Sequence, residues 1–221
     1  MDTVRAFVGC LLDLTATRRV VDLARAVRRA SDAAGWKAAW VPPPNLHVTL
    51  RFLGDIDAGL VPALSDGLAN IARQHAPLRF TVSGLVAFPS RESPRVVCAD
   101  ITQGHEALGA LARAVDDLLF DLGIPREKRP FHGHVTLARV KHAPTALSGL
   151  GLPNADCGPA TVNEITLWRS DLQRAGAEYH ALWRHPLGAQ PTPKPIPTAT
   201  ESPTKQATPA TPGQDTSSSE R

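Results

Sequence analysis

The sequence predicts an α+β fold of two similar lobes, each with an antiparallel sheet, that meet at a central cleft with helices packed outside. Two observations predict it. Strand-like and helix-like segments follow the same order in both halves of the chain, and each half contains the tetrapeptide His-Val-Thr-Leu, at 47–50 and at 134–137. Such an internal repeat predicts a pseudo-two-fold axis that brings the two motif strands side by side.

The first half begins with a strand and a helix. Residues 4–12 are rich in Val, Phe and Leu, which is typical of a buried strand. Apolar residues recur at helical spacing over 16–34, and Thr15 and Gly35 are candidates for the N-cap and the C-terminal stop of this helix. A short apolar strand at 36–41 ends at three consecutive prolines, which cannot join a central ladder.

The first motif lies on the strand that follows these prolines. This strand is predicted over 47–53 and ends at a turn formed by residues 54–55. Leucine and isoleucine at helical spacing then predict a helix over 60–71, and an alternating pattern predicts a strand over 78–88.

The second half repeats this order. A strand over 95–101 is followed by a strongly amphipathic helix over 108–119. A charged loop then leads into the second motif strand, 134–140. Two further strands, at 161–168 and 178–187, close the predicted fold.

Composition separates the chain into one globular domain and a tail. Residues 1–188 are predicted to form the bilobal domain, and 43% of the whole chain is hydrophobic. From residue 189 to 221 the chain is rich in Pro, Thr and Ser without apolar periodicity, so we expect it to be disordered. The net charge of +3 and the pI near 9.0 favour a phosphate-bearing partner. The charge is too small to indicate a nucleic-acid-binding surface by itself.

The cysteines and the N-terminus indicate the compartment. Cys10, Cys98 and Cys157 are odd in number and far apart, which disfavours a disulfide framework and a thiolate zinc site. The chain shows neither a signal-peptide pattern at its start nor an apolar run of membrane-spanning length. We therefore expect a cytoplasmic protein without membrane contact.

The repeated motif carries the candidate chemistry. Strand alternation puts His47 and Thr49 on one face, and His134 and Thr136 on the equivalent face. Hydrolysis of a phosphodiester needs a base on one side of phosphorus and an acid on the other, and two opposed histidines supply both near neutral pH. The threonine hydroxyls can donate to phosphate oxygens, and Arg51 shares their face as a further candidate for phosphate binding.

Two other interpretations of these histidines are less favoured. One His-x-Thr segment alone is typical of a half-exposed strand, but an identical segment at equivalent places in two halves favours a site. His132 and His134 have the spacing of a metal-binding pair, yet no Asp or Glu occurs between residues 129 and 155 as a third ligand. We therefore expect neither a metal nor a cofactor, and His132 is predicted to line the pocket or face solvent.

These residues resemble the two-histidine (2H) phosphoesterase superfamily, and within it the RNA 2′,3′-cyclic phosphodiesterases long labelled 2′-5′ RNA ligases. The resemblance spans residues 3–187, and the tail lies outside it. Four segments carry it: Arg-Ala-Phe-Val-Gly at 5–9, residues 40–54 with the first motif, Phe-His-Gly-His-Val-Thr-Leu-Ala-Arg at 131–139, and Leu-Trp-Arg-Ser at 167–170.

The resemblance implies a role for each motif residue. His47 would be the proton donor and His134 the proton acceptor, with Thr49 and Thr136 holding the phosphate; the residues themselves leave open which histidine is the acid. The implied reaction is metal-independent hydrolysis of RNA or nucleotide 2′,3′-cyclic phosphate ends to 2′-phosphates, by a chain that we expect to be a monomer. One departure is visible, because the family commonly has proline before the second histidine and this chain has Gly133.

Three alternatives remain open: reversible 2′-5′ RNA ligation, hydrolysis of another small cyclic phosphate, and a non-catalytic module that binds RNA ends. The intact histidines and threonines argue against the last. Among other residues, Arg139 is predicted on the face opposite His134 unless its strand is bulged. Two groups are weaker candidates for RNA contact: the basic cluster Arg126, Lys128 and Arg129, and the tryptophans Trp36 and Trp40, for which core packing is favoured.

Overall fold

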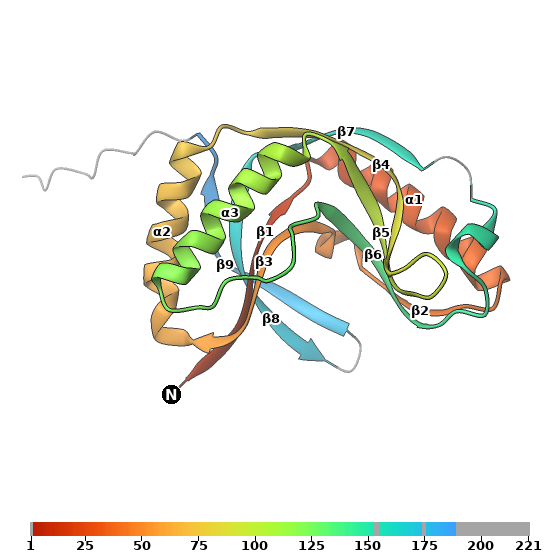
Figure 1. Cartoon of the computed structure of the whole chain (residues 1–221), viewed down its shortest axis with the longest axis horizontal. Helices are drawn as coiled ribbons and strands as arrows, with labels where there is room; N and C mark the ends of the chain where they lie inside the picture. Colours follow the sequence, from red (N-terminus) through yellow and green to blue (C-terminus); the bar gives the residue numbers. More distant parts are fainter. Residues whose placement is uncertain (1, 153–154, 174–175, 189–221) are drawn as a thin grey trace, which may run out of the picture. The chain divides into compact units, whose positions relative to one another are not determined.

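Nine strands form one curled antiparallel sheet within the described residues, which are 2–152, 155–173 and 176–188 of a computed structural model (Figure 1). The strands are β1 (Thr3–Leu11), β2 (Lys37–Trp40), β3 (His47–Asp57), β4 (Leu78–Pro89), β5 (Pro94–Gln103), β6 (His134–His142), β7 (Asp156–Val162), β8 (Glu164–Gln173) and β9 (Gly176–Pro186). The helices are α1 (Leu14–Ala33), α2 (Val61–Gln74) and α3 (His105–Asp121).

The chain divides into two units, Met1–Gln190 and Pro191–Arg221. The described residues all belong to the first unit. The tail predicted at 189–221 lies outside the described residues, so its disorder and the predicted domain boundary stay predictions. Of the helices in the described part of the chain, none combines the length and apolar composition that a membrane crossing needs.

The order of the strands confirms the predicted internal repeat. It reads β7-β4-β5-β6-β3-β1-β8-β9, with β2 paired with β6 outside this series, so the two motif strands, β6 and β3, occupy the centre. Each is flanked by the first strand of its own sequence half, β5 beside β6 and β1 beside β3. The motif strands pair at Val48 and Val135, where the pseudo-two-fold axis passes. The two predicted sheets are thus the halves of one continuous sheet, and the predicted α+β class is confirmed.

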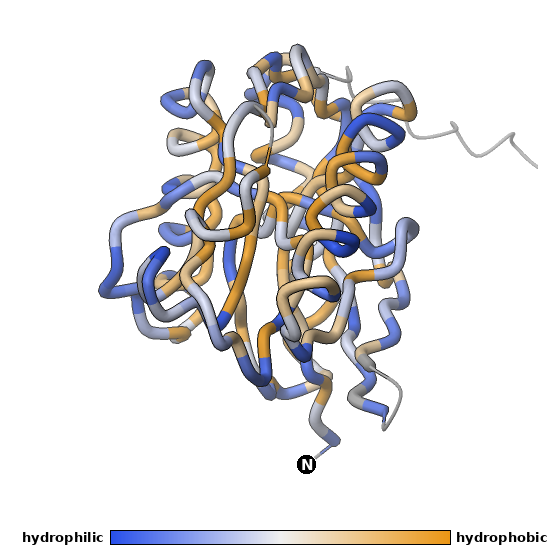
Figure 2. The backbone as a smooth tube through the Cα atoms, turned by 90° about the vertical axis from the view of Figure 1, so that its right-hand side faces the viewer, coloured by the Kyte–Doolittle hydropathy of each residue, from blue (hydrophilic) through white to orange (hydrophobic). Residues whose placement is uncertain are grey.

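The helices cover the sheet halves in a crossed arrangement. Helix α1 follows β1 but packs against β7 and β2, in the half that contains β6. Helices α2 and α3 pack against each other and against β3, β8 and β9 in the other half (Figure 1). Hydrophobic stretches of the strands and the inward faces of the helices gather between these layers (Figure 2). Leu64 and Leu68 of α2 are fully buried, and each such side chain stabilises the fold by roughly 1.5–3 kcal/mol.

The helix cap predicted at Thr15 is wrong. Asp13 is the N-cap of α1, and its carboxylate accepts hydrogen bonds from the backbone N–H of Ala16 at 2.9 Å and of Thr161 at 2.7 Å. A carboxylate has two acceptor oxygens, so one residue caps the helix and also ties it to β7. A single hydroxyl could not serve both donors equally well.

Two strand boundaries also differ from the prediction. The turn predicted at 54–55 is absent from β3, which continues to Asp57 because Gly54, at a φ of 71°, accommodates an irregularity in the pairing with β1. The single strand predicted over 161–168 is the end of β7 and the start of β8, separated by Asn163. Apolar residues on both sides of this tight connection concealed it in the sequence.

Candidate active site

The first residue of each motif strand is its histidine, and the pairing of Val48 with Val135 holds the strands together at that point. Both valines are fully buried. Alternation therefore turns the histidine and threonine of each motif to the opposite face of the sheet. There His134, Thr49 and Thr136 line one large cavity.

A bulge follows each threonine and turns two further side chains into the site. In the pairing of β3 with β1, Leu50 is the extra residue, and in the pairing of β6 with β5, Leu137 takes the same place. An extra residue resets the alternation of a strand. Phe52 and Arg139, which are equivalent in the two halves, consequently line the site. The sequence predicted Arg139 on the face of His134 only if its strand were bulged. Strand β6 has this bulge.

Equivalent hydrogen bonds fix the two imidazole rings. The Nδ1–H of His47 donates to the carbonyl oxygen of Asn45, and the Nδ1–H of His134 donates to that of His132, both at 2.7 Å. A carbonyl oxygen can only accept, so in the neutral rings the proton is on Nδ1 and the lone pair on Nε2. Each histidine therefore presents Nε2 for proton transfer.

The residues that supply these carbonyls are themselves tied to a neighbouring strand. The side-chain amide of Asn45 donates to the carbonyl oxygen of Ala177 on β9 at 3.1 Å. The Nε2 of His132 lies 2.9 Å from a carboxylate oxygen of Asp100 on β5. Asp100 is also the backbone pairing partner of His134. These two contacts are the supports of the histidines. The support of His47 ends on a neutral carbonyl, and the support of His134 ends on a carboxylate.

Aromatic rings and a threonine surround His47. Its ring stacks on Phe7, with centroids 4.9 Å apart, and meets the edge of Tyr179 at 5.5 Å. Its Nε2 lies 2.9 Å from the hydroxyl of Thr49. Gly9 is required beside it, because a Cβ there would lie 2.8 Å from the carbonyl oxygen of Val48 and 3.3 Å from the His47 ring.

The surroundings of His134 differ. Its ring centroid is 5.2 Å from that of Phe88 and 6.1 Å from that of His132. The hydroxyl of Thr136 accepts a weak hydrogen bond from the buried thiol of Cys98 at 3.8 Å. This leaves the threonine proton available to a ligand.

Burial lowers the pKa of both histidines below the usual value. The hydrogen bond that His47 donates to the carbonyl oxygen of Asn45 partly offsets the pKa decrease of His47, whereas the charges of His134 and Arg139 add to it. For His134, the hydrogen bond to His132 and the charge of Asp100 oppose the decrease, and the charge of His132 adds to it. The two rings are therefore mainly neutral at neutral pH, and among the described residues a carboxylate, Asp100, supports a proton on His134 but none does so on His47.

Arg51, predicted as a phosphate ligand, is engaged elsewhere. Its guanidinium donates to the carboxylate of Asp116 on α3 at 2.9 Å and to the carbonyl oxygens of Phe52 and Pro125 at 2.7 and 2.6 Å. These bonds occupy three of its five N–H donors, and the side chain is only 12% exposed. Arg51 still lines the large cavity with Thr49 and Thr136, so the predicted phosphate contact stays a prediction, although the bulge at Leu50 turns the guanidinium toward α3.

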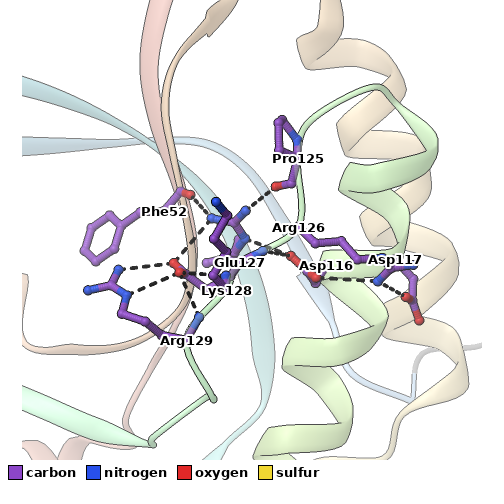
Figure 3. A network of polar contacts seen from close by, with 9 residues as sticks. Phe52, Asp116, Asp117, Pro125, Arg126, Glu127, Lys128 and Arg129 are labelled. Carbon is purple, nitrogen blue, oxygen red and sulfur yellow. Dashed lines mark hydrogen bonds and ion pairs between the residues drawn. The ribbon is translucent and has the colours of Figure 1, made fainter.

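The basic cluster of the preceding loop belongs to the same network (Figure 3). Arg126 pairs with Asp117 at 2.5 Å, and Arg129 pairs with Glu127 at 3.2 Å. Hydrogen bonds from Arg129 lower the pKa of Glu127 to about 2. The arginine charges are thus balanced by carboxylates, which weakens the case for an RNA-backbone contact and favours a role in holding the loop before His134.

Two cavities open at this face of the sheet. The larger, about 1320 Å³, contains His134 and both motif threonines and extends along α3. The smaller, about 320 Å³, is lined by Phe7 and Tyr179, the two rings that contact His47. Phe52 and Arg139 line both cavities and separate them.

The described residues contain no cluster of three or more His, Cys, Asp or Glu side chains able to hold a metal ion. His132 lines the large cavity, as the sequence predicted, and is bound to Asp100. Trp36 is 6% exposed and donates to the hydroxyl of Thr145, which confirms core packing.

Sequence reasoning missed Asn45, Asp100 and Tyr179. Asn45 stands two residues before its histidine, as His132 does, so the matching spacing was an available signal. Asp100 and Tyr179 reach the site only through strand pairing, and no local pattern marks them.

Residues 12–98 and 101–179 match the family model described as LigT-like phosphoesterase. A protein of Aquifex aeolicus named RNA 2′,3′-cyclic phosphodiesterase is 31% identical over 192 residues, which cover 85% of this chain and 100% of that relative. A protein of Thermus thermophilus with the same name is 37% identical over 164 residues, 69% of this chain and 76% of that relative.

Solved structures show the same similarity. The crystal structure of a Thermus thermophilus protein superposes with a TM-score of 0.72 at 30% identity, covering 84% of this chain and 99% of that one. That of E. coli LigT in apo form gives a TM-score of 0.67 at 25% identity, covering 86% and 100%.

Proposed function

Because the chain belongs to the LigT-like phosphoesterase family, we propose that it hydrolyses the 2′,3′-cyclic phosphate ends of RNA or nucleotides to 2′-phosphates. Relatives of at least 30% identity over most of the chain are named for this activity. One observation of the site carries the proposal: two histidines on equivalent strands are fixed by the same Nδ1–H bond, so that each leaves Nε2 for proton transfer. A hydrolase of this kind needs one such nitrogen on each side of phosphorus.

In the proposed reaction, His134 takes a proton from water, whose oxygen forms a bond to phosphorus. The bond from phosphorus to O3′ breaks, and His47 donates a proton to O3′, which leaves the phosphate on O2′. The carboxylate of Asp100 supports this assignment, because it stabilises the imidazolium that forms on the acceptor. The histidines then exchange their protons with solvent.

His47 is the proposed proton donor for two reasons. Burial and the charge of Arg139 lower its pKa, and a weaker base is a stronger acid toward the leaving oxygen. Binding of a phosphate anion raises the proton affinity of a neighbouring imidazole. Protonation of His47 is therefore expected in the complex rather than in the free enzyme.

The phosphate is proposed to lie between the hydroxyls of Thr49 and Thr136, with Arg139 beside it. Arg139 replaces Arg51 as the candidate for charge compensation, since it lines both cavities and is exposed. The expected monomeric state and cytoplasmic location stay predictions.

The test is incubation with adenosine 2′,3′-cyclic phosphate and with an RNA that ends in a 2′,3′-cyclic phosphate, in the presence of EDTA. We expect turnover with a 2′-phosphate product on both substrates. A 3′-phosphate product would contradict the assigned leaving group, and loss of activity in EDTA would contradict metal-independent chemistry. Tight binding without turnover would favour a binding module, and joining to an added 5′-hydroxyl RNA would favour ligation.

A further inference from the structure

The two cavities beside the catalytic pair differ in which histidine they adjoin. His134 lines the large cavity directly. The small cavity adjoins His47, because its wall contains both Phe7 and Tyr179. A substrate bound between the histidines therefore has a different space on each side of its phosphorus.

The proposed chemistry determines which space the nucleoside occupies. In an in-line displacement, water enters on the side of the base and the leaving oxygen departs on the side of the acid. The leaving O3′ belongs to the ribose of the terminal nucleoside, and His47 protonates it. We propose that the terminal nucleoside lies in the small cavity, and that Arg5 binds the phosphate on its 5′ oxygen. This inference rests on the proposed function.

The size and the aromatic walls of the small cavity suit a nucleoside. About 320 Å³ lies at the lower end of the range, roughly 300–1,000 Å³, in which small-molecule sites fall. Phe52 is 55% exposed although it is a large apolar side chain, and Tyr179 is half-buried at the same cavity. Aromatic faces of this kind stack on the bases of single-stranded nucleic acid.

The charges of the small cavity favour an anion. The charged residues among its described lining are Arg5 and Arg139, both cationic. The large cavity, in contrast, also contains carboxylates: its charged lining is Arg51, Arg113, Arg129 and Arg139 with Glu106, Asp116 and Glu127. A nucleotide phosphate meets no carboxylate in the wall of the small cavity.

Arg5 is available and suitably spaced. It precedes Phe7 by two residues on β1, so it lies on the same face as Phe7. The Cα atoms of the two residues are about 7 Å apart along the strand, and Arg5 is the one further from His47. Its ion pair with Asp55, at 3.6 Å, is long and exposed, with 47% and 66% of the two side chains accessible. Such a pair is weak and leaves guanidinium donors for a phosphate.

The kinetic test compares adenosine 2′,3′-cyclic phosphate that carries a 5′-hydroxyl with the same compound that carries a 5′-phosphate. We expect the wild type to prefer the 5′-phosphorylated substrate by about tenfold or more in kcat/KM, the effect of one charge-assisted contact. Arg5→Gln should bring this ratio close to 1. The matched control is Arg25→Gln, which removes an arginine from an exposed ion pair on α1 and should keep the wild-type ratio.

The outcomes separate the inference from the proposed function. Absence of hydrolysis of either compound by the wild type overturns the proposed function. Hydrolysis of both with a ratio near 1, or a ratio that Arg113→Gln abolishes and Arg5→Gln does not, overturns the small-cavity assignment. The second of these results would put the nucleoside in the large cavity.

A spectroscopic test needs no turnover. Tyr179 is the only tyrosine in the chain, so protein labelled with 3-fluorotyrosine gives one fluorine resonance. Adenosine 2′-phosphate should shift this resonance in a saturable manner, because its base lies against the ring, and inorganic phosphate should shift it much less. Equal shifts with the two ligands would overturn the assignment.

Discussion

The half of the site built around His47 and the half built around His134 have the same backbone and different neighbours. Each has the same tetrapeptide, a bulge at its leucine, and a carbonyl two residues earlier that holds Nδ1–H at 2.7 Å. His47 lies between aromatic rings near Arg139, whereas His134 has Asp100 as its strand partner.

This difference explains how a sequence repeat gives two histidines with different proton affinities. The repeated backbone puts two imidazoles in equivalent poses, which by itself would give two identical groups. Nearby charges then make their proton affinities unequal, because a cation disfavours an imidazolium and a carboxylate favours it. In the proposed mechanism, one repeated motif thereby provides both the acid and the base.

The largest expected effect tests whether the halves act as one unit. His47→Ala and His134→Ala should each lower kcat by about 10²–10⁴, since each removes a proton-transfer group. The double variant should lose far less than the product of the two losses, because residues that act together are not additive. Steady-state kinetics measures this, with His142→Ala, an exposed residue at the end of β6, as the control. Fully multiplicative losses would contradict a joint mechanism.

The next prediction tests the electrostatic difference between the two supports. Asp100→Asn removes the charge that raises the pKa of His134, so the acid limb of the kcat/KM profile should move to lower pH. We also expect kcat to fall about tenfold, as His134 becomes a weaker base. The measurement is a pH profile from about 5 to 8.

The matched variant of this prediction is Asn45→Ala, which removes the tie between Asn45 and Ala177 without changing charge. It should lower kcat while leaving the acid limb in place. If both variants shift the acid limb of the kcat/KM profile by the same amount, the charge of Asp100 does not set the pKa of His134. The supports of the two histidines are then equivalent.

The smallest expected effect compares the glycines beside the two histidines. A Cβ on Gly9 would lie 2.8 Å from a backbone oxygen, so Gly9→Ala should destabilise the fold by about 1–3 kcal/mol. At Gly133 the nearest atom to a Cβ would be 3.4 Å away, on the side chain of Ile101, and Gly133→Ala should stabilise by about 0.4–1 kcal/mol. Thermal unfolding measures both, and a large loss in Gly133→Ala would show that the second motif needs its glycine.

Prediction from the sequence succeeded where local pattern and structure coincide. Periods of two and of three to four residues located the strands and helices, and the repeated tetrapeptide located both histidines on paired strands. It did not foresee the hydrogen bonds of Arg51 to α3 and the following loop, because alternation was extended through a bulge that only the pairing with β1 reveals. It failed at Thr15 because the better cap, Asp13, also meets a donor from β7.

The sequence by itself determined the α+β class, the internal repeat, and the two histidines with their threonines. Each of these depends on residues close together in the chain, or on the tetrapeptide that occurs twice. The tertiary structure decided the rest: the turn of Arg139 into the site, the engagement of Arg51 by α3, and the position of Asp100 beside His134. These depend on strand register, which is set by packing between segments far apart in the sequence.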